Sequence, residues 1–161
     1  MRILWVLSVD PGRPRDGQLT YSLALIDAVA AAGVDVTVVH LGTTSPEVRD
    51  GVPLRWLAAG TANRNRLLSV LSPLPAMAYT AGSPEFRRLL VDQLGSQWDA
   101  VVIDHVQSGW ALKPVIDALG RSTLGRSTLV VHVSHNDERA VRSNVASGTA
   151  TNAVWNPSVT K

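Results

Sequence analysis

Short apolar runs alternate along this chain with stretches of helical periodicity. The runs are rich in Val, Ile and Leu and have the length of strands, whereas the stretches between them place apolar residues three and four positions apart. The predicted strands are Arg2–Val9, Asp35–Leu41, Val52–Leu57, Asp99–Asp104 and Leu129–Val133. The predicted helices are Leu19–Ala32, Arg64–Ser72, Pro84–Leu94, Gln107–Leu119 and Asn136–Ala146. Strands separated by helices favour parallel pairing, so we predict an α/β fold with a doubly wound parallel sheet.

The chain has the length of a single domain. Its 161 residues suffice for one substantial core but not for two ordinary ones, and we place the domain at residues 1–146. Residues 147–161 are polar and aperiodic, so we expect this tail to be poorly ordered. The pentapeptide GRSTL stands at 120–124 and again at 125–129, which we interpret as a tolerated loop insertion.

Composition narrows the class of protein. There is no cysteine, which excludes disulfides and thiolate metal sites, and the net charge of +2 is too small to favour nucleic acid as a partner. The apolar stretch Ile3–Val9 is too short to span a membrane and lacks a signal-peptide pattern, so we expect a cytoplasmic protein. Peripheral membrane contact stays open because Leu67–Tyr79 is apolar enough to touch lipid, although such a stretch is more often core and loop.

The loop after the first strand is the first candidate site. Gly12 and Gly17 have the spacing of a phosphate loop, but Gln18 and Leu19 follow where Lys and Ser or Thr are needed. The dinucleotide pattern G-x-G-x-x-G is absent as well. ATP hydrolysis and NAD binding are therefore weakly supported.

Two interpretations of this loop remain open. In one, a glycine turn at the start of a helix offers the backbone N–H groups of Gly17 and Gln18 to phosphate, with Arg13 and Arg15 as further partners. In the other, it is a surface loop in which Gly17 only satisfies the backbone geometry.

Two more loops at strand ends carry polar residues, and ligands of open α/β sheets lie beyond such ends. Asp104 and His105 follow the fourth strand and suit acid–base or hydrogen-bonding roles, although a capping Asp and a half-buried structural His explain them equally simply. His135 follows the fifth strand and has no evident structural role, whereas His132 inside that strand is expected in the core. A metal site of Asp104, His105 and His135 lacks ligand spacing on one element, so we expect no metal.

These pieces resemble, in order and over residues 1–146, the N-terminal domain of a GT-B glycosyltransferase of the family 4 type. The segments that carry the resemblance are MRILWVLSVDPGRPRDGQLTYSLALIDAVAAAGVDVTVVHL, SPEFRRLLVDQLGSQWDAVVIDH and VVHVSHNDERAVR. The resemblance implies a Rossmann-like domain that forms one half of a GT-B fold.

The resemblance also implies roles for particular residues. Asp16 and Gly17 stand at the family's Gly-Gly turn near the donor diphosphate, where Asp16 departs from the pattern by adding a negative charge. Either His105 or Asp104 occupies the position of the family's strand-end histidine near the sugar. His135 matches a second such histidine, and the match S-H-N-x-E is completed by two residues on the acceptor side, Asn136 and Glu138.

The activity implied is that of a retaining hexosyltransferase, which moves a sugar from a nucleotide-sugar donor to an acceptor hydroxyl without a cofactor. The family's donor-binding C-terminal domain is not among these residues, so we expect the chain alone to be inactive and to need that domain or a partner chain. We expect self-association through an exposed cleft face, with Trp110 and Trp155 exposed there. The alternatives are a stand-alone Rossmann-like binding or regulatory module for a phosphosugar or a protein and, more weakly, a sugar-nucleotide epimerase.

Overall fold

The computed structural model describes residues 1–14, 16–62, 72–121 and 128–134. Within these residues the strands are β1 (Arg2–Leu7), β2 (Asp35–His40), β3 (Leu54–Ala58), β4 (Ala100–Asp104) and β5 (Leu129–Val133). They form one sheet in the order β3-β2-β1-β4-β5, and every neighbouring pair is parallel. The predicted α/β fold with a Rossmann-like parallel sheet is therefore confirmed.

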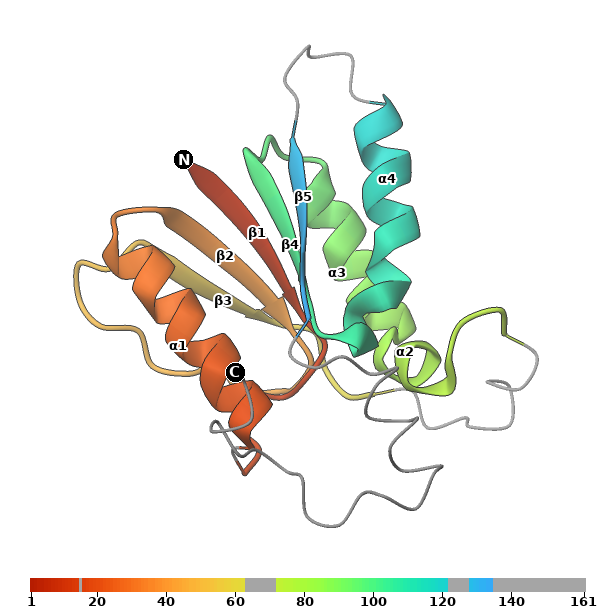
Figure 1. The fold of residues 1–161 in the computed structure, drawn as a ribbon, viewed down its shortest axis with the longest axis horizontal. Coiled ribbons are helices and arrows are strands. Elements are labelled where there is room, and N and C mark those ends of the chain that lie inside the picture. The colour runs from red at the N-terminus through yellow and green to blue at the C-terminus, as the bar shows by residue number, and fades with distance from the viewer. Residues whose placement is uncertain (15, 63–71, 122–127, 135–161) are drawn as a thin grey trace, which may run out of the picture.

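Helices lie on both faces of this sheet. They are α1 (Gly17–Ala31), α2 (Ala76–Ala81), α3 (Pro84–Leu94) and α4 (Leu112–Arg121), and a 3₁₀ helix, η2 (Val106–Ala111), leads into α4. Figure 1 shows α1 over one side of the sheet, with α3 and α4 on the other side beside β4 and β5. No helix in the part of the chain that is described is long and apolar enough to cross a membrane.

The core has two halves because alternate side chains of a strand point to opposite faces. One half contains Trp5 and Leu7 of β1 packed under Leu19, Leu23 and Ile26 of α1. The other half joins the opposite face of the sheet to α3, η2 and α4, and its largest buried side chains are Leu4, Phe86, Leu90 and Trp110. Burial on both faces explains why β1 and β4 are continuous apolar runs rather than alternating ones.

The edge strand β5 corrects one prediction. We expected His132 in the core, but its side chain is exposed, and Leu129 at the start of the strand is 60% exposed. Side chains of a strand point to the two faces of the sheet, and at β5, the last strand in the order, both faces are only partly covered. Val130 and Val131, which point to opposite faces, are themselves only partly buried.

The predicted helix Gln107–Leu119 is wrong at its start. The segment begins as η2, and the α-helix starts only at Leu112. The 3₁₀ turn brings two buried side chains, Ser108 and Trp110, onto the end of β1. Trp110 is 1% exposed, so the expectation that it lies on an open apolar surface is wrong too.

Helix ends follow the sequence more closely. Ser83 caps α3, its Oγ accepting from the backbone N–H of Phe86 at 3.3 Å, as predicted. The short helix α2 was not predicted and contributes Ala78 and Ala81 to the core. The predicted helices Arg64–Ser72 and Asn136–Ala146, most of the GRSTL repeat, the tail and Trp155 lie outside the described residues, apart from Ser72.

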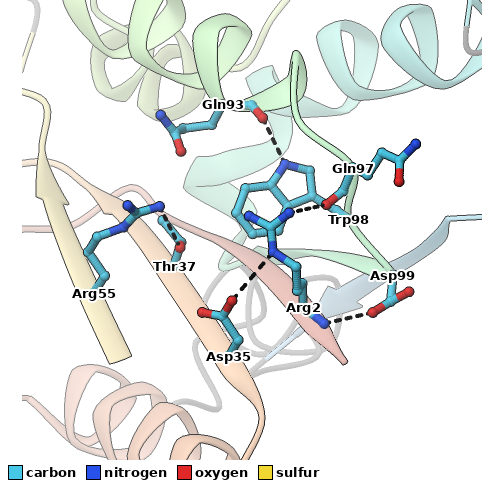
Figure 2. A network of polar contacts seen from close by, with 8 residues as sticks. All are labelled: Arg2, Asp35, Thr37, Arg55, Gln93, Gln97, Trp98 and Asp99. Carbon is cyan, nitrogen blue, oxygen red and sulfur yellow. Dashed lines mark hydrogen bonds and ion pairs between the residues drawn. The ribbon is translucent and has the colours of Figure 1, made fainter. Parts of the chain in front are cut away.

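The amino ends of the strands are tied together by Arg2. Its backbone N–H donates to the Asp99 carboxylate at 2.7 Å, its Nη1 donates to the Gln97 carbonyl at 3.0 Å, and its Nε lies 3.4 Å from Asp35 Oδ2 (Figure 2). The guanidinium also lies 4.7 Å from the ring centroid of Trp98. One side chain therefore links the starts of β1 and β2 to the turn that leads into β4.

Candidate functional site

The sheet changes its winding direction between β1 and β4. The chain passes from β1 outward through β2 to β3, and later from β4 outward to β5 on the other side. The loops that follow β1 and β4 therefore meet at the carboxyl edge, which is where open α/β sheets bind ligands. These two loops contain the predicted residues Asp16 and His105.

The loop after β1 is folded onto the loop after β2. The Asp10 carboxylate accepts from the backbone N–H of Gly12 at 2.8 Å and lies against Gly42. A Cβ added to Gly42 would lie 2.7 Å from Asp10 Oδ1, and Gly42 has a φ of +127°. Only glycine fits both the backbone conformation and this close approach.

Asp16 caps helix α1. Its Oδ1 accepts from the backbone N–H of Leu19 at 2.8 Å, and its Oδ2 lies 2.6 Å from Arg13 Nη2. The Leu19 N–H is the largest cause that lowers the pKa of Asp16. Arg13, His105 and the Gln18 N–H lower it further, while burial opposes the shift.

The start of α1 is therefore already occupied by a carboxylate of the chain itself. This is the position at which a phosphate would meet the helix N-terminus. Of the other residues predicted for phosphate, Gly17 is exposed with open space around it, and Gln18 is half-buried. Arg13 is engaged by Asp16, and Arg15 lies outside the described residues.

His105 is held in an unusual backbone conformation. It has φ 73° and ψ 149°, and it is the only non-glycine residue with positive φ in the described ranges. Such conformations cost of order 1–3 kcal/mol and are concentrated at functional sites. The backbone N–H of His105 donates to the Val133 carbonyl at 3.1 Å, and its carbonyl accepts from the Ser108 N–H at 3.0 Å.

The imidazole of His105 interacts electrostatically with Asp16. A positive charge on His105 lowers the pKa of the Asp16 carboxyl. His105 is only 3% exposed, whereas the Asp16 side chain is 52% exposed, so this interaction joins a buried ring to a carboxylate at the surface. The structure thus brings together one predicted residue from the loop after β1 and one from the loop after β4.

Asp104 plays a different part from its neighbour. It is the last residue of β4, is fully buried, and accepts a hydrogen bond from Trp5 Nε1 at 2.9 Å. Trp5 belongs to the core beneath α1, so the Asp104 carboxylate is tied to that core.

A buried hydroxyl pair joins η2 to β1, and sequence reasoning missed it. Ser108 Oγ donates to the Val6 carbonyl at 3.2 Å and accepts from the Ser8 N–H at 3.1 Å. Trp110 Nε1 donates to Ser8 Oγ at 3.0 Å. These bonds fix the segment that follows His105 against the end of β1. A serine at the end of an apolar run was the only signal in the sequence.

His40, at the end of β2, was also missed. Its Nδ1 lies 3.0 Å from the Leu41 carbonyl, which can only accept, so Nδ1 carries the proton and Nε2 faces Ser45 Oγ at 3.1 Å. The ring packs edge-on against Trp56 at 5.6 Å. Burial is the main cause that lowers the pKa of His40, while the Leu41 carbonyl and Asp10 oppose it. The neutral imidazole therefore braces the loop after β2.

The remaining predictions cannot be placed. His135, Asn136 and Glu138 lie outside the described residues. Among the residues that are described, no three His, Asp or Glu side chains gather as a metal site would require. No protein-family model matches this sequence, and no curated protein matches it either.

Proposed function

We propose that this chain is the N-terminal, acceptor-side domain of a retaining glycosyltransferase of GT-B fold, of the family 4 type. The observation that carries the proposal is the strained backbone of His105, held at the point where the sheet reverses its winding direction. The resemblance of the sequence supplies the reaction class, since fold alone does not specify a function.

In the proposed reaction the anomeric C–O bond to the donor diphosphate breaks, and a bond to the acceptor oxygen forms on the same face of the sugar. The acceptor proton leaves with the diphosphate. His105, braced by Ser108, orients the sugar or acceptor, and the resemblance gives His135 the same role. Asp104 supports this position from the core through Trp5, while Asn136 and Glu138 belong to the acceptor side.

The donor diphosphate is bound chiefly elsewhere in this proposal. Asp16 caps α1 and pairs with Arg13, so the loop after β1 brings a negative charge and an engaged arginine toward the donor. In this proposal the loop contacts the donor through the backbone at Gly17, which has open space around it. Basic side chains and a helix N-terminus of a second α/β domain, in a longer chain or a partner chain, would stabilise the leaving diphosphate without metal. The 161 residues alone are then inactive, and a cytoplasmic site of action, with or without peripheral membrane contact, is part of the proposal.

The test is a comparison of two histidines in the protein as its gene encodes it. His105→Ala should lower the release of nucleoside diphosphate from a panel of sugar nucleotides by about 100-fold, the range for a lost acid–base or positioning group. His132→Ala is the matched control, because that side chain is exposed on β5 and should leave turnover unchanged. Equal turnover of wild type and His105→Ala would contradict the assignment.

A stand-alone binding module is the second candidate. The observation in its favour is the ion pair of Arg13 with Asp16. This pair neutralises, within the loop, a positive charge that a transferase could use to bind the donor diphosphate. Calorimetry of the 161-residue chain with sugar nucleotides separates the two. Micromolar binding favours the module, since a half-enzyme would lack most donor contacts. Product analysis without an acceptor tests the weaker possibility of an epimerase.

A further inference from the structure

Arg87 is a half-buried cation at the junction of α2 and α3. It lies one turn into α3, and its Nε donates to the carbonyl of Gly82 at 2.9 Å. Its guanidinium lies over the ring of Trp110 at 5.1 Å from the centroid. Because Trp110 donates to Ser8 at the end of β1, Arg87 belongs to the carboxyl edge of the sheet, on the face covered by α3.

The position of this guanidinium is fixed on several sides. A Cβ added to Gly82 would lie 2.7 Å from Trp110 Cγ and 2.9 Å from Arg87 Nη2, so the glycine permits their close approach. Trp110 is in turn held edge-on by Phe86 at 4.8 Å. A guanidinium held in place beforehand loses little freedom when it binds a ligand.

The charge of Arg87 has no counter-charge in the described ranges. No Asp or Glu of those residues lies within ion-pair distance of it, in contrast to Arg2, Arg13 and Arg49. Burial lowers the pKa of Arg87, and the nearby Tyr79 opposes that shift. Arginine nevertheless stays charged in proteins, so a partly desolvated positive charge persists there.

The terminal nitrogens of Arg87 are left for a ligand. Only Nε makes a hydrogen bond to the described part of the chain. The two NH₂ groups form a fork that suits two oxygens of one carboxylate or phosphate group.

We propose that Arg87 forms a binding site for an oxyanion, either a phosphate monoester or a carboxylate, on the α3 side of the carboxyl edge. If the chain is the acceptor-side domain of a glycosyltransferase, as proposed above, this anion is a group of the acceptor, and the acceptor is negatively charged. The site itself does not depend on that function.

The experiment is a titration of the full chain with inorganic phosphate and, separately, with acetate, followed by NMR of the arginine Nε–H groups. We expect saturable binding that Arg87→Gln weakens by at least about tenfold, as for a lost charge-assisted hydrogen-bonded pair. Arg88→Gln makes the same change in net charge at the next, exposed position and should bind as wild type. The tighter of the two anions identifies the chemical class.

A second variant guards against misfolding of Arg87→Gln. Arg87→Lys keeps the charge but loses the fork, so it should weaken binding about threefold or more. Absence of saturable binding by both anions, unchanged binding by the Arg87 variants, or an equal loss in Arg88→Gln would each overturn the site. The titration contains no sugar nucleotide, so its result tests the anion site independently of the proposed glycosyl transfer.

Discussion

Charged and polar residues lie at both edges of the sheet, but their surroundings differ between the two edges. At the amino edge, the Arg2 guanidinium meets the Asp35 carboxylate and a backbone carbonyl, and the Arg2 N–H meets Asp99 (Figure 2). At the carboxyl edge, His105 is held at positive φ and Arg87 has no carboxylate partner in the described structure. Asp16 occupies a position that suits an anion.

This difference separates stability from function. The guanidinium and the backbone N–H of Arg2 already have partners within the chain, so they are not available to bind a ligand. The carboxyl edge keeps a costly backbone conformation and a partly desolvated charge, which persist only where the surrounding structure enforces them. Substitutions at the two edges should therefore have different consequences.

The largest difference is expected at two glycines with positive φ. Gly42→Ala, at the carboxyl edge, forces a Cβ to within 2.7 Å of Asp10 Oδ1 and should lower the free energy of unfolding by about 3 kcal/mol. Gly33→Ala, at the amino edge, meets open space and suffers only backbone strain, about 1 kcal/mol. Urea unfolding followed by circular dichroism measures both, and equal losses would contradict the close fit of the loops after β1 and β2.

The next effect isolates the strain at His105. His105→Ala and His105→Gly both remove the imidazole, but only glycine adopts φ 73° and ψ 149° without cost. We expect the glycine variant to be more stable than the alanine variant by about 2 kcal/mol. If the alanine variant is equally stable in urea unfolding, the backbone at residue 105 is not strained.

A smaller effect distinguishes bracing of the site from general stability. Ser108→Ala removes the hydroxyl that binds β1 and should lower the free energy of unfolding by about 1–2 kcal/mol. Arg2→Gln, at the amino edge, should cost about 1 kcal/mol, because its ion pair is half-exposed.

Only the Ser108 variant should increase the reactivity of His105 toward diethyl pyrocarbonate, mapped by mass spectrometry. His132 serves as an internal standard because it is already exposed. An equal rise in His105 reactivity in both variants would mean that Ser108 contributes stability without positioning the histidine.

The sheet could be predicted from sequence because its signals are local. β-branched runs such as the one in β2 and the cap at Ser83 act within a few residues, and both were found where expected. The 3₁₀ segment η2 was missed because its cause is distant, namely hydrogen bonds of Ser108 and Trp110 to a strand about 100 residues earlier.

The candidate site was predictable only in part, for the same reason. Polar residues at a strand end identified His105, since ligands of open α/β sheets lie beyond such ends, and the resemblance to the family's Gly-Gly turn identified Asp16. The burial of Asp104 beside Trp5 and the lack of a counter-charge at Arg87 depend on tertiary packing, which no spacing in the sequence reports.

The smallest expected effect is a pH dependence at Asp16. Its folded-state pKa lies below the ordinary value, so the ionised carboxylate contributes stability above that ordinary value, and this contribution is lost as pH falls toward the lower folded pKa. Asn at this position can still cap α1 but cannot titrate. Asp16→Asn should therefore flatten the acid limb of a plot of unfolding free energy against pH, slightly, because the side chain is 52% exposed. The same acid limb in both proteins would show that the Leu19 N–H, Arg13 and His105 do not stabilise the charge, and the contrast between the two edges would then rest on His105 and Arg87 alone.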